Sequence, residues 1–350
     1  MFKTHSAGIG DLLRSSAAWR ALKNHFPQAE LHLLLLTRDP GYNSERFIAR
    51  HHLLTSFRSL DKRTKGLADW RKLLRQVGEY TDSFQPDLIV DFEPNGVRTS
   101  ILAFWLAWRH HARTIGIGEV LGRGIFYQRA SVSTNRFAAQ RNLAEGFDYT
   151  TRDFVALSVL GIERGDTAIE LEETAEGREF RQNFRRRFGL PEDARLLGLN
   201  IGCGTPDADK RRPSLPLVSK LAAHLQTVHG LHLVVGLGAP FESKLDQQFL
   251  ELHRQNCNAP VTDLGGKISL LELSGLIKTS SLFVSGDTGP YHMAVALRTP
   301  TLAIFNWNCT VAFHHHAWVK CLLATSPDDL PRVTQAADEL LKTAAVPATS

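Results

Sequence analysis

Cysteine is scarce in this sequence and long hydrophobic runs are missing, and each shortage excludes a class of protein. The only cysteines in the 350 residues are Cys203, Cys257, Cys309 and Cys321. No two of them form a Cys-x-x-Cys pair and none has histidines at finger spacing, which excludes a disulfide framework and a zinc finger and favours a reducing compartment. The longest apolar run, 101–108, is far shorter than the roughly 20 residues that a membrane-spanning helix needs.

The sequence also has only a small excess of positive charge. Lys and Arg outnumber Asp and Glu by 41 to 36, a net charge of +5 at pH 7. This suits an anionic ligand or surface but is too little to indicate nucleic acid, so we expect no nucleic-acid partner. A hydrophobic fraction of 43% excludes a disordered chain. The opening MFKTHSAGIGD has no apolar signal core, so we expect a cytoplasmic protein.

Short β-rich segments alternate with helix-length amphipathic segments. This alternation of strands and helices predicts parallel sheets covered by helices on both faces. At the start of the chain MFKTHS is short and polar, so it predicts only a weak first strand. Strands are expected at 31–36, 87–91, 114–117, 196–201, 232–236, 261–264, 282–285, 301–305 and 319–323. Helices are expected at about 11–25, 67–83, 98–111, 215–229, 241–255, 269–279, 289–297 and 332–345.

A charged segment interrupts the alternation between about residues 163 and 195, and its pattern indicates an exposed helix plus linker. We therefore predict an α/β protein with two Rossmann-like, doubly wound domains, 1–165 and 195–350, joined by a linker at 166–194. The last helix is expected either to stay in its own domain or to pack back on the N-terminal one. Ligands of such sheets lie beyond the carboxyl ends of the strands, so the turns that follow strands are the candidate sites.

The first such turn is SAGIGD, in which Gly8 and Gly10 permit a tight turn before a helix. Leu13 stands where the dinucleotide fingerprint requires a third glycine, which argues against nicotinamide binding. Asp11 is then either a helix N-cap or a carboxylate that acts as a general base.

The second turn follows the strand expected at 196–201. Gly202 and Gly204 let backbone amides approach a ligand, Thr205 offers a hydroxyl, and Lys210 adds a positive charge. Together these residues indicate a diphosphate cradle. The alternative is an ordinary glycine turn with solvated basic residues.

The third turn, in SGDTGPYHMAVAL, is the most specific. Pro290 suits the first position of a helix, and the amides of Thr288 and Gly289 suit a phosphate at that helix start. Asp287 either caps the helix or accepts hydroxyl protons from a sugar. His292 either donates to a phosphate or packs as a neutral core histidine.

Four further sequence features indicate a function less specifically than these turns do. Glu242 is either a ribose-binding residue or a first-turn glutamate, and Ile268 is placed to lie against a nucleobase. The three histidines 314–316 do not share one face of a strand or helix, so we predict no metal site there. The segment 101–111 suits a membrane surface or a packed helix, and its nearly all-round apolar character favours packing.

Four segments, SAGIGDLLRSSAAWRALKNHFP, DKRRPSLP, GAPFE and VSGDTGPYHMAVALRTPTLAIF, resemble in that order glycosyltransferase family 9, the bacterial lipopolysaccharide heptosyltransferases. The resemblance extends from about residue 6 to 306. It implies the GT-B fold, in which two Rossmann-like domains face each other across a cleft. It also implies acceptor binding by the N-terminal domain, donor binding by the C-terminal domain, and inverting sugar transfer with no cofactor and no essential metal.

The resemblance also implies a role for individual residues. Asp11 matches the catalytic base. The acceptor side matches basic residues at Arg98 and Arg123, with Arg129 as a weaker match. Residues matching the donor site are Thr205 and Lys210 for phosphate, Glu242 for ribose, Ile268 for adenine, and Asp287, Thr288, Gly289 and His292 for the diphosphate loop.

The implied donor is ADP-heptose and the implied acceptor an anionic glycolipid of the lipopolysaccharide inner core. The protein is then expected to be a monomer on the cytoplasmic side of the inner membrane, with peripheral contact to that membrane. Residues 306–310 depart from the Gly-Pro-Thr-Asp-Pro usual in the family, which leaves a UDP- or GDP-sugar open as donor. The sequence also leaves open a nucleotide-sugar 2-epimerase and a non-catalytic nucleotide-sugar-binding protein of the same fold.

Overall fold

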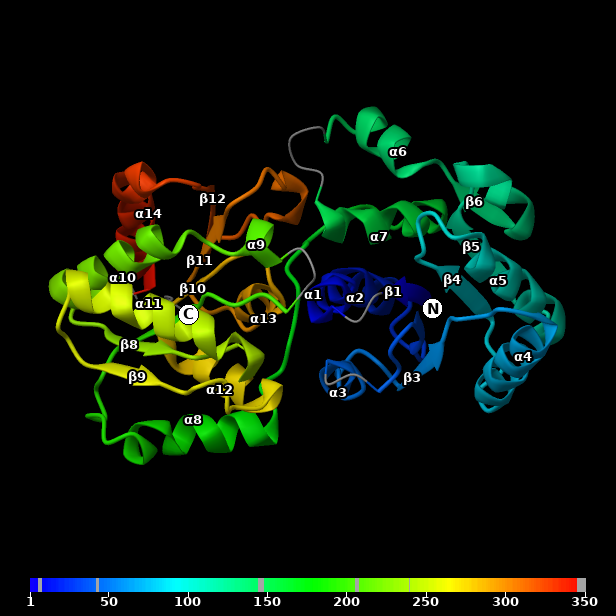
Figure 1. The fold of residues 1–350 in the computed structure, drawn as a ribbon. Helices are drawn as coiled ribbons and strands as arrows, with labels where there is room; N and C mark the ends of the chain where they lie inside the picture. Colours follow the sequence, from blue (N-terminus) through cyan, green and yellow to red (C-terminus); the bar gives the residue numbers. More distant parts are fainter. Residues whose placement is uncertain (6–7, 42–43, 144–147, 205–207, 239, 345–350) are drawn as a thin grey trace. The chain divides into compact units, whose positions relative to one another are not determined.

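The computed structural model describes residues 1–350 except 6–7, 42–43, 144–147, 205–207, 239 and 345–350. The chain divides into two compact units, 1–169 and 170–350 (Figure 1). Each unit has its own parallel sheet with helices packed on it.

The sheet of unit 1–169 has six strands in the spatial order β3-β2-β1-β4-β5-β6. The strands are β1 (Phe2–His5), β2 (His32–Thr37), β3 (Ser56–Asp61), β4 (Leu88–Asp91), β5 (Arg113–Ile117) and β6 (Arg129–Ser131). The helices are α1 (Ile9–Arg14), α2 (Ser16–His25), α3 (Glu45–Ile48), α4 (Leu67–Asp82), α5 (Val97–His110), η1 (Val120–Phe126), α6 (Thr134–Gln140), α7 (Tyr149–Leu157) and η2 (Ser158–Leu160).

The sheet of unit 170–350 repeats this topology, with the order β12-β11-β10-β7-β8-β9. The strands are β7 (Leu196–Asn200), β8 (His232–Val235), β9 (Val261–Asp263), β10 (Ser280–Ser285), β11 (Thr301–Phe305) and β12 (Val319–Leu323). The helices are α8 (Ala175–Arg187), α9 (Ala208–Arg211), α10 (Leu215–His229), η3 (Pro240–Glu242), α11 (Ser243–Asn256), α12 (Leu270–Thr279), α13 (Gly289–Ala296), η4 (Thr310–Ala312), η5 (Pro327–Asp329) and α14 (Leu330–Ala344).

The strand order reverses within each sheet, which creates a topological switch point between β1 and β4 in one unit and between β7 and β10 in the other. Ligands of doubly wound sheets bind at the carboxyl ends of the strands at such a point. The start of α1 and the start of α13 therefore both occupy the position where a ligand site is expected.

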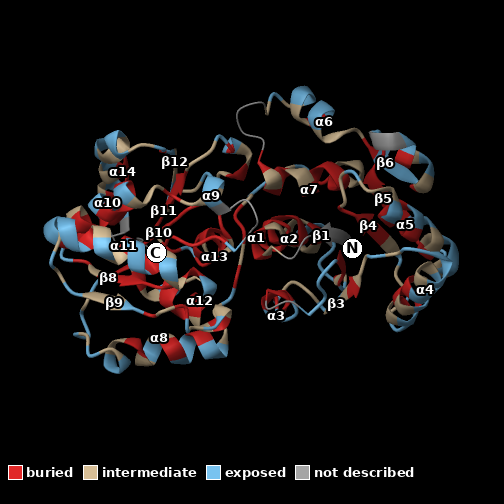
Figure 2. Cartoon of the chain, in the orientation of Figure 1, coloured by how far each residue is buried: buried red, intermediate tan, exposed pale blue. Residues whose placement is uncertain are grey.

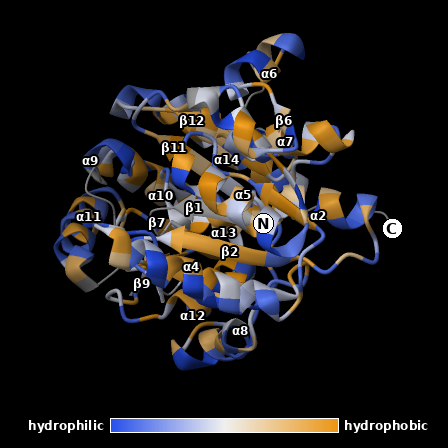
Figure 3. Cartoon of the chain, turned by 90° about the vertical axis from the view of Figure 1, so that its right-hand side faces the viewer, coloured by the Kyte–Doolittle hydropathy of each residue, from blue (hydrophilic) through white to orange (hydrophobic). Residues whose placement is uncertain are grey.

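Leucine-rich strands such as β2, with the sequence HLLLLT, are buried on both faces by helices, and burial drives the formation of each unit (Figures 2 and 3). All nine strands predicted from the sequence are confirmed. β1 forms a central strand although its sequence is short and polar, because it pairs with β2 on one side and β4 on the other. β3, which pairs with β2 along its whole length, and the short β6 were not predicted.

The structure corrects the expectation for one further element and decides between the alternatives for another. Within the predicted linker, α8 packs against α12 so closely that a Cβ on Gly275 would lie 1.9 Å from the carbonyl oxygen of Gly177. The terminal helix α14 lies in the core of its own unit, where Val333 and Ala337 are fully buried. Among the described helices, none is long and apolar enough to cross a bilayer.

Candidate active site

A buried asparagine joins the turns that follow β7 and β10. The Asn200 side-chain amide donates to Ser285 Oγ and to Thr288 Oγ1, both at 3.1 Å, and the two hydroxyl oxygens lie 2.9 Å apart. Thr288 is the N-cap residue of α13, yet its side chain makes no capping hydrogen bond to that helix. The start of α13 thus presents backbone amides and the positive end of the helix dipole, an arrangement that attracts phosphate.

An ion pair fixes the next residue of this turn. Asp287 is 5% exposed, and its Oδ2 lies 2.7 Å from Nη1 of Arg211. Gly286 permits the approach, because a Cβ there would lie 2.4 Å from the carbonyl oxygen of Arg211. The guanidinium also lies 5.3 Å from the ring centroid of Trp307, in the segment that departs from the family pattern. Arg211 is therefore held between a carboxylate and an indole ring.

Two glycines make room for the carboxylate of Glu242. A Cβ on Gly202 would lie 2.4 Å, and one on Gly238 2.3 Å, from Glu242 Oε2. The backbone amide of Cys203 donates to Oε1 at 2.6 Å, and Nη2 of Arg212 lies 3.5 Å from the same oxygen. The carboxylate is thereby fixed between the turns that follow β7 and β8. The sequence indicated no function for Cys203. In the structure its backbone amide holds the carboxylate of Glu242.

A second buried carboxyl group, that of Asp246 on α11, lies near Glu242. Asp246 is 4% exposed, and its Oδ2 has no hydrogen-bond partner among the described residues. Burial, together with the negative charges of Asp263 and Glu242, raises the pKa of Asp246 to about 7. This residue carried no motif that would have marked it in the sequence.

The predicted phosphate-binding residues fare differently. Lys210 is exposed on α9, and Thr205 lies outside the described residues. The cations that contact the buried carboxylates are the two neighbours, Arg211 and Arg212. The sequence located the basic segment, but only the structure shows which of its members point to Asp287 and Glu242.

His292 lies in the first turn of α13 and is buried. Its Nδ1 is 3.0 Å from Nε2 of His314, and its Nε2 is 4.0 Å from Oδ1 of Asp287. His314 is also buried, and its amide donates to the hydroxyl of Tyr291 at 3.0 Å. Of the three consecutive histidines, His314 thus contacts the first turn of α13, which the sequence did not predict.

Ile268 is half-buried in the loop between β9 and α12. That loop is tied to the end of β8, because the amide of Gly266 donates to the carbonyl oxygen of Gly236 at 2.9 Å. Ser269 and Glu272 then form a capping box at the start of α12. The backbone around Ile268 is accordingly fixed at the same edge of the sheet as Glu242.

In the other unit, Asp11 lies in the first turn of α1, after the central strand β1. It is not the N-cap residue, because Gly8 occupies that position. Its carboxylate is 29% exposed and lies 3.6 Å from Nη1 of Arg14, whose guanidinium stacks 4.8 Å from the ring centroid of Tyr149. A carboxylate that is both positioned and accessible is what a general base requires.

Cations gather near the carboxyl ends of β2, β3 and β4. Arg98 is exposed at the start of α5, and its Nη1 donates to the carbonyl oxygen of Lys62 at 3.1 Å. Burial and the nearby charges of Arg38 and Arg98 lower the pKa of Lys62, against the opposing effect of Glu93. Arg38 and Lys62 were not singled out in the sequence.

Arg123 has a different surrounding. Its side chain is fully buried, with Nη2 2.9 Å from Asp91 Oδ2 and 2.6 Å from the hydroxyl of Tyr127, and with Nε 2.7 Å from Ser100 Oγ. In the structure Arg123 thus joins β4, α5 and η1, and its acceptor contact stays a prediction. Arg129 is exposed on β6.

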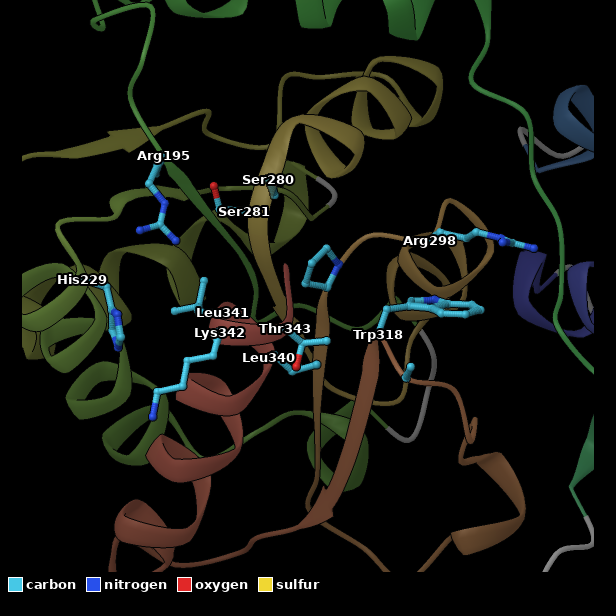
Figure 4. Close-up of a pocket in the computed structure, with 12 residues that line it drawn as sticks. Arg195, His229, Ser280, Ser281, Arg298, Trp318, Leu340, Leu341, Lys342 and Thr343 are labelled. Atoms are coloured by element: carbon cyan, nitrogen blue, oxygen red, sulfur yellow. The ribbon is translucent and has the colours of Figure 1, made fainter. Parts of the chain in front are cut away.

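Two other features lie away from these turns. A cavity of about 700 Å³ opens at the amino ends of β10 to β12, where Arg195, Ser280 and Trp318 line it together with α14 (Figure 4). At the same edge His224, His229 and Asp338 bring their ligand atoms within 4.8 Å of one another, close enough to share a metal ion. None of these residues belongs to the predicted site.

Comparison with known proteins shows what this part of the chain resembles. The family model of glycosyltransferase family 9 (heptosyltransferase) matches residues 199–316, the segment that holds Asn200, Glu242, Asp287 and His292. Lipooligosaccharide heptosyltransferase 2 from Campylobacter jejuni is 27% identical over 126 residues, which are 36% of this chain and 38% of that relative. The chain is thus matched to less than half the length of this curated relative.

Solved structures extend the likeness of the fold. A family 9 glycosyl transferase from Veillonella parvula has a TM-score of 0.76 with this chain at 18% sequence identity. The alignment covers 98% of this chain and 97% of that chain. The E. coli heptosyltransferase WaaC with ADP has a TM-score of 0.63 at 16% identity, over 98% and 99% of the two chains.

The two doubly wound units define a GT-B fold. The resemblance to glycosyltransferase family 9 is confirmed over residues 199–316, which the family model matches.

Proposed function

We propose that this protein is an inverting glycosyltransferase that moves a heptose, or a related sugar, from an ADP-activated donor to a lipopolysaccharide inner core or a similar cell-envelope saccharide. One observation carries the proposal. The turns after β7, β8 and β10 bring together a buried carboxylate, Glu242, and a helix start at Asp287–Gly289, and all of them lie in the family-matched segment. A carboxylate suits a ribose diol, and a helix start suits a diphosphate.

On the donor side, the leaving diphosphate gains negative charge as the glycosidic bond to phosphate breaks. The amides at the start of α13 and the charge of Lys210 stabilise that charge without a metal ion. Asp287 contributes indirectly, because it fixes Arg211 beside the same turn. Ile268 contacts the adenine.

On the acceptor side, Asp11 accepts the proton of the attacking hydroxyl while the new bond from oxygen to the anomeric carbon forms. One direct displacement of ADP inverts that carbon. The cations Arg98, Lys62 and Arg38 suit an anionic glycolipid at the cytoplasmic face of the inner membrane. A UDP- or GDP-sugar donor is the second candidate, because residues 306–310 depart from the family pattern and Trp307 among them lies against Arg211, beside the turn before α13.

The first experiment compares thermal stabilisation of the wild type by ADP, UDP and GDP at equal concentration. A nucleotide at about 100 times its Kd stabilises by roughly 2.7 kcal/mol, which shifts the Tm by several degrees. We expect ADP to give this shift. A larger shift with UDP or GDP reassigns the donor, and no shift with any of them contradicts the donor site itself.

The second experiment tests the base by sugar transfer from ADP-heptose to a delipidated inner-core saccharide. Asp11→Asn should lower kcat at least 100-fold and leave the Tm shift with ADP unchanged, because the base acts only on the acceptor proton. Asp87→Asn is the matched control, an exposed carboxylate at the opposite end of β4. Transfer by Asp11→Asn at the wild-type rate would refute the role of Asp11.

A further inference from the structure

We propose that the outer face of α5, together with Ile125 of η1, is a surface that binds an anionic phospholipid bilayer. The surface consists of Ile101, Phe104, Trp108 and Ile125, and we call it the outer apolar face. The proposal rests on the proposed function for its purpose, because an acceptor anchored in a membrane must be reached from that membrane.

Helix α5 has two apolar faces with different surroundings. Leu102, Ala103 and Leu106 are fully buried against the sheet, as expected for a packed helix. On the opposite side Phe104 is 53% and Trp108 is 73% exposed. An ordinary helix on a doubly wound sheet has polar residues on that side, so packing within the unit does not account for these rings.

The exposed apolar side chains form one continuous surface. Ile101, Phe104 and Trp108 follow one another at intervals of three and four residues, which places them on one face of a helix. Ile125, 80% exposed, adds to it from η1, which packs on α5 and brings the ring centroid of Phe126 within 6.1 Å of that of Phe104. Contiguous apolar surface of this kind indicates an interaction site.

The charges around the outer apolar face select the partner. Arg98 precedes Ile101 on the helix and is exposed, as are Arg113 on β5 and Arg129 on β6. Arg109, which follows Trp108, is also exposed but forms an ion pair with Asp82 on α4. Apolar and aromatic side chains bordered by arginine are typical of helices that lie in the interface of an anionic membrane. A second copy of the chain would bring like charges together. A stable dimer would also need to bury about 800 Å² of surface on each partner, which is more than four partly exposed side chains supply.

The test is sedimentation of the full chain with vesicles of phosphatidylethanolamine and phosphatidylglycerol. We expect binding that weakens in about 0.5 M salt and on vesicles of phosphatidylcholine alone. The double variant Phe104→Ser with Trp108→Ser should lower the partition coefficient about tenfold or more, because two large apolar groups no longer enter the interface. Leu67→Ser is the matched control, since Leu67 is 78% exposed on α4 of the same unit, and it should bind like the wild type.

Vesicle binding by the double variant at the wild-type level would overturn the proposal. So would a wild type that ignores the vesicles but forms a dimer that the double variant cannot form, because the face would then be a contact between copies. Transfer to a delipidated acceptor separates this proposal from the proposed function. It should be unchanged in the double variant, and its absence in the wild type would contradict the proposed function while leaving the vesicle result intact.

Discussion

Arg211 and Asp287 form an ion pair between the segment that follows β7 and the turn that follows β10, with Nη1 and Oδ2 2.7 Å apart. They are 76 positions apart in the chain. The carboxylate is buried and the guanidinium is partly exposed, so the pair fixes the turn before α13 from its solvent side. The arrangement of the turns after β7 and β10 depends on this contact and on Gly286 beside it.

Removing the guanidinium should destabilise the protein. Arg211→Ala leaves the buried carboxylate of Asp287 without its cation, and we expect a loss of about 1–3 kcal/mol, seen as a Tm lower by several degrees. Lys210→Ala should leave the Tm unchanged, since Lys210 is exposed, but should reduce the Tm shift caused by ADP. Equal Tm values for the two variants in the absence of nucleotide would contradict the role given to Arg211.

Two nearby glycines provide a matched pair of substitutions. Gly202→Ala places a Cβ 2.4 Å from Glu242 Oε2, so the carboxylate must move. Gly204→Ala, two residues later, meets its nearest atom, Cζ of Phe241, at an ordinary 3.9 Å. We expect the first variant to weaken ADP binding about tenfold in calorimetry and the second to bind like the wild type. Similar affinities for both variants would show that the position of Glu242 does not matter for the donor.

The two arginines predicted on the acceptor side should respond differently. Arg123→Met removes the partner of the buried Asp91 and should cost about 3–5 kcal/mol of unfolding free energy, measured by urea denaturation. Arg98→Ala, at an exposed position, should change stability by no more than about 0.5 kcal/mol and should raise KM for the acceptor. A stable Arg123→Met with a raised acceptor KM would contradict the structural role and support the predicted acceptor contact of Arg123.

The carboxyl group of Asp246 should make stability depend on pH. Its pKa rises from 3.8 to about 7 on folding, so the folded protein keeps a proton that the unfolded chain releases. Stability is therefore lost as the pH rises through that window. Asp246→Asn removes this loss, and its Tm should exceed that of the wild type by more at pH 8 than at pH 5. The exposed Asp193→Asn is the control, and a Tm difference for Asp246→Asn that is equal at both pH values would contradict the shift.

Much of the fold was predictable because its signals are local. Strands such as Leu196–Asn200 are short apolar runs between turn residues, and α10 was predicted with both its ends correct. β1 was underestimated because FKTH has little intrinsic strand signal, and its place in the sheet depends on pairing with β2 and β4. α8 was assigned to an exposed linker because its many charges hide the face that packs on α12.

By itself, the sequence determined the two doubly wound units, the order of the turns, and the residue types at the turns before α1 and α13, because glycine, proline and capping residues act over a few positions. Only the tertiary structure decided which cation reaches which carboxylate. Arg211 rather than Lys210 contacts Asp287, and Arg123 is enclosed beside Asp91. Such pairs join segments that are distant in sequence, and the burial that fixes their partners exists only once the sheets have formed.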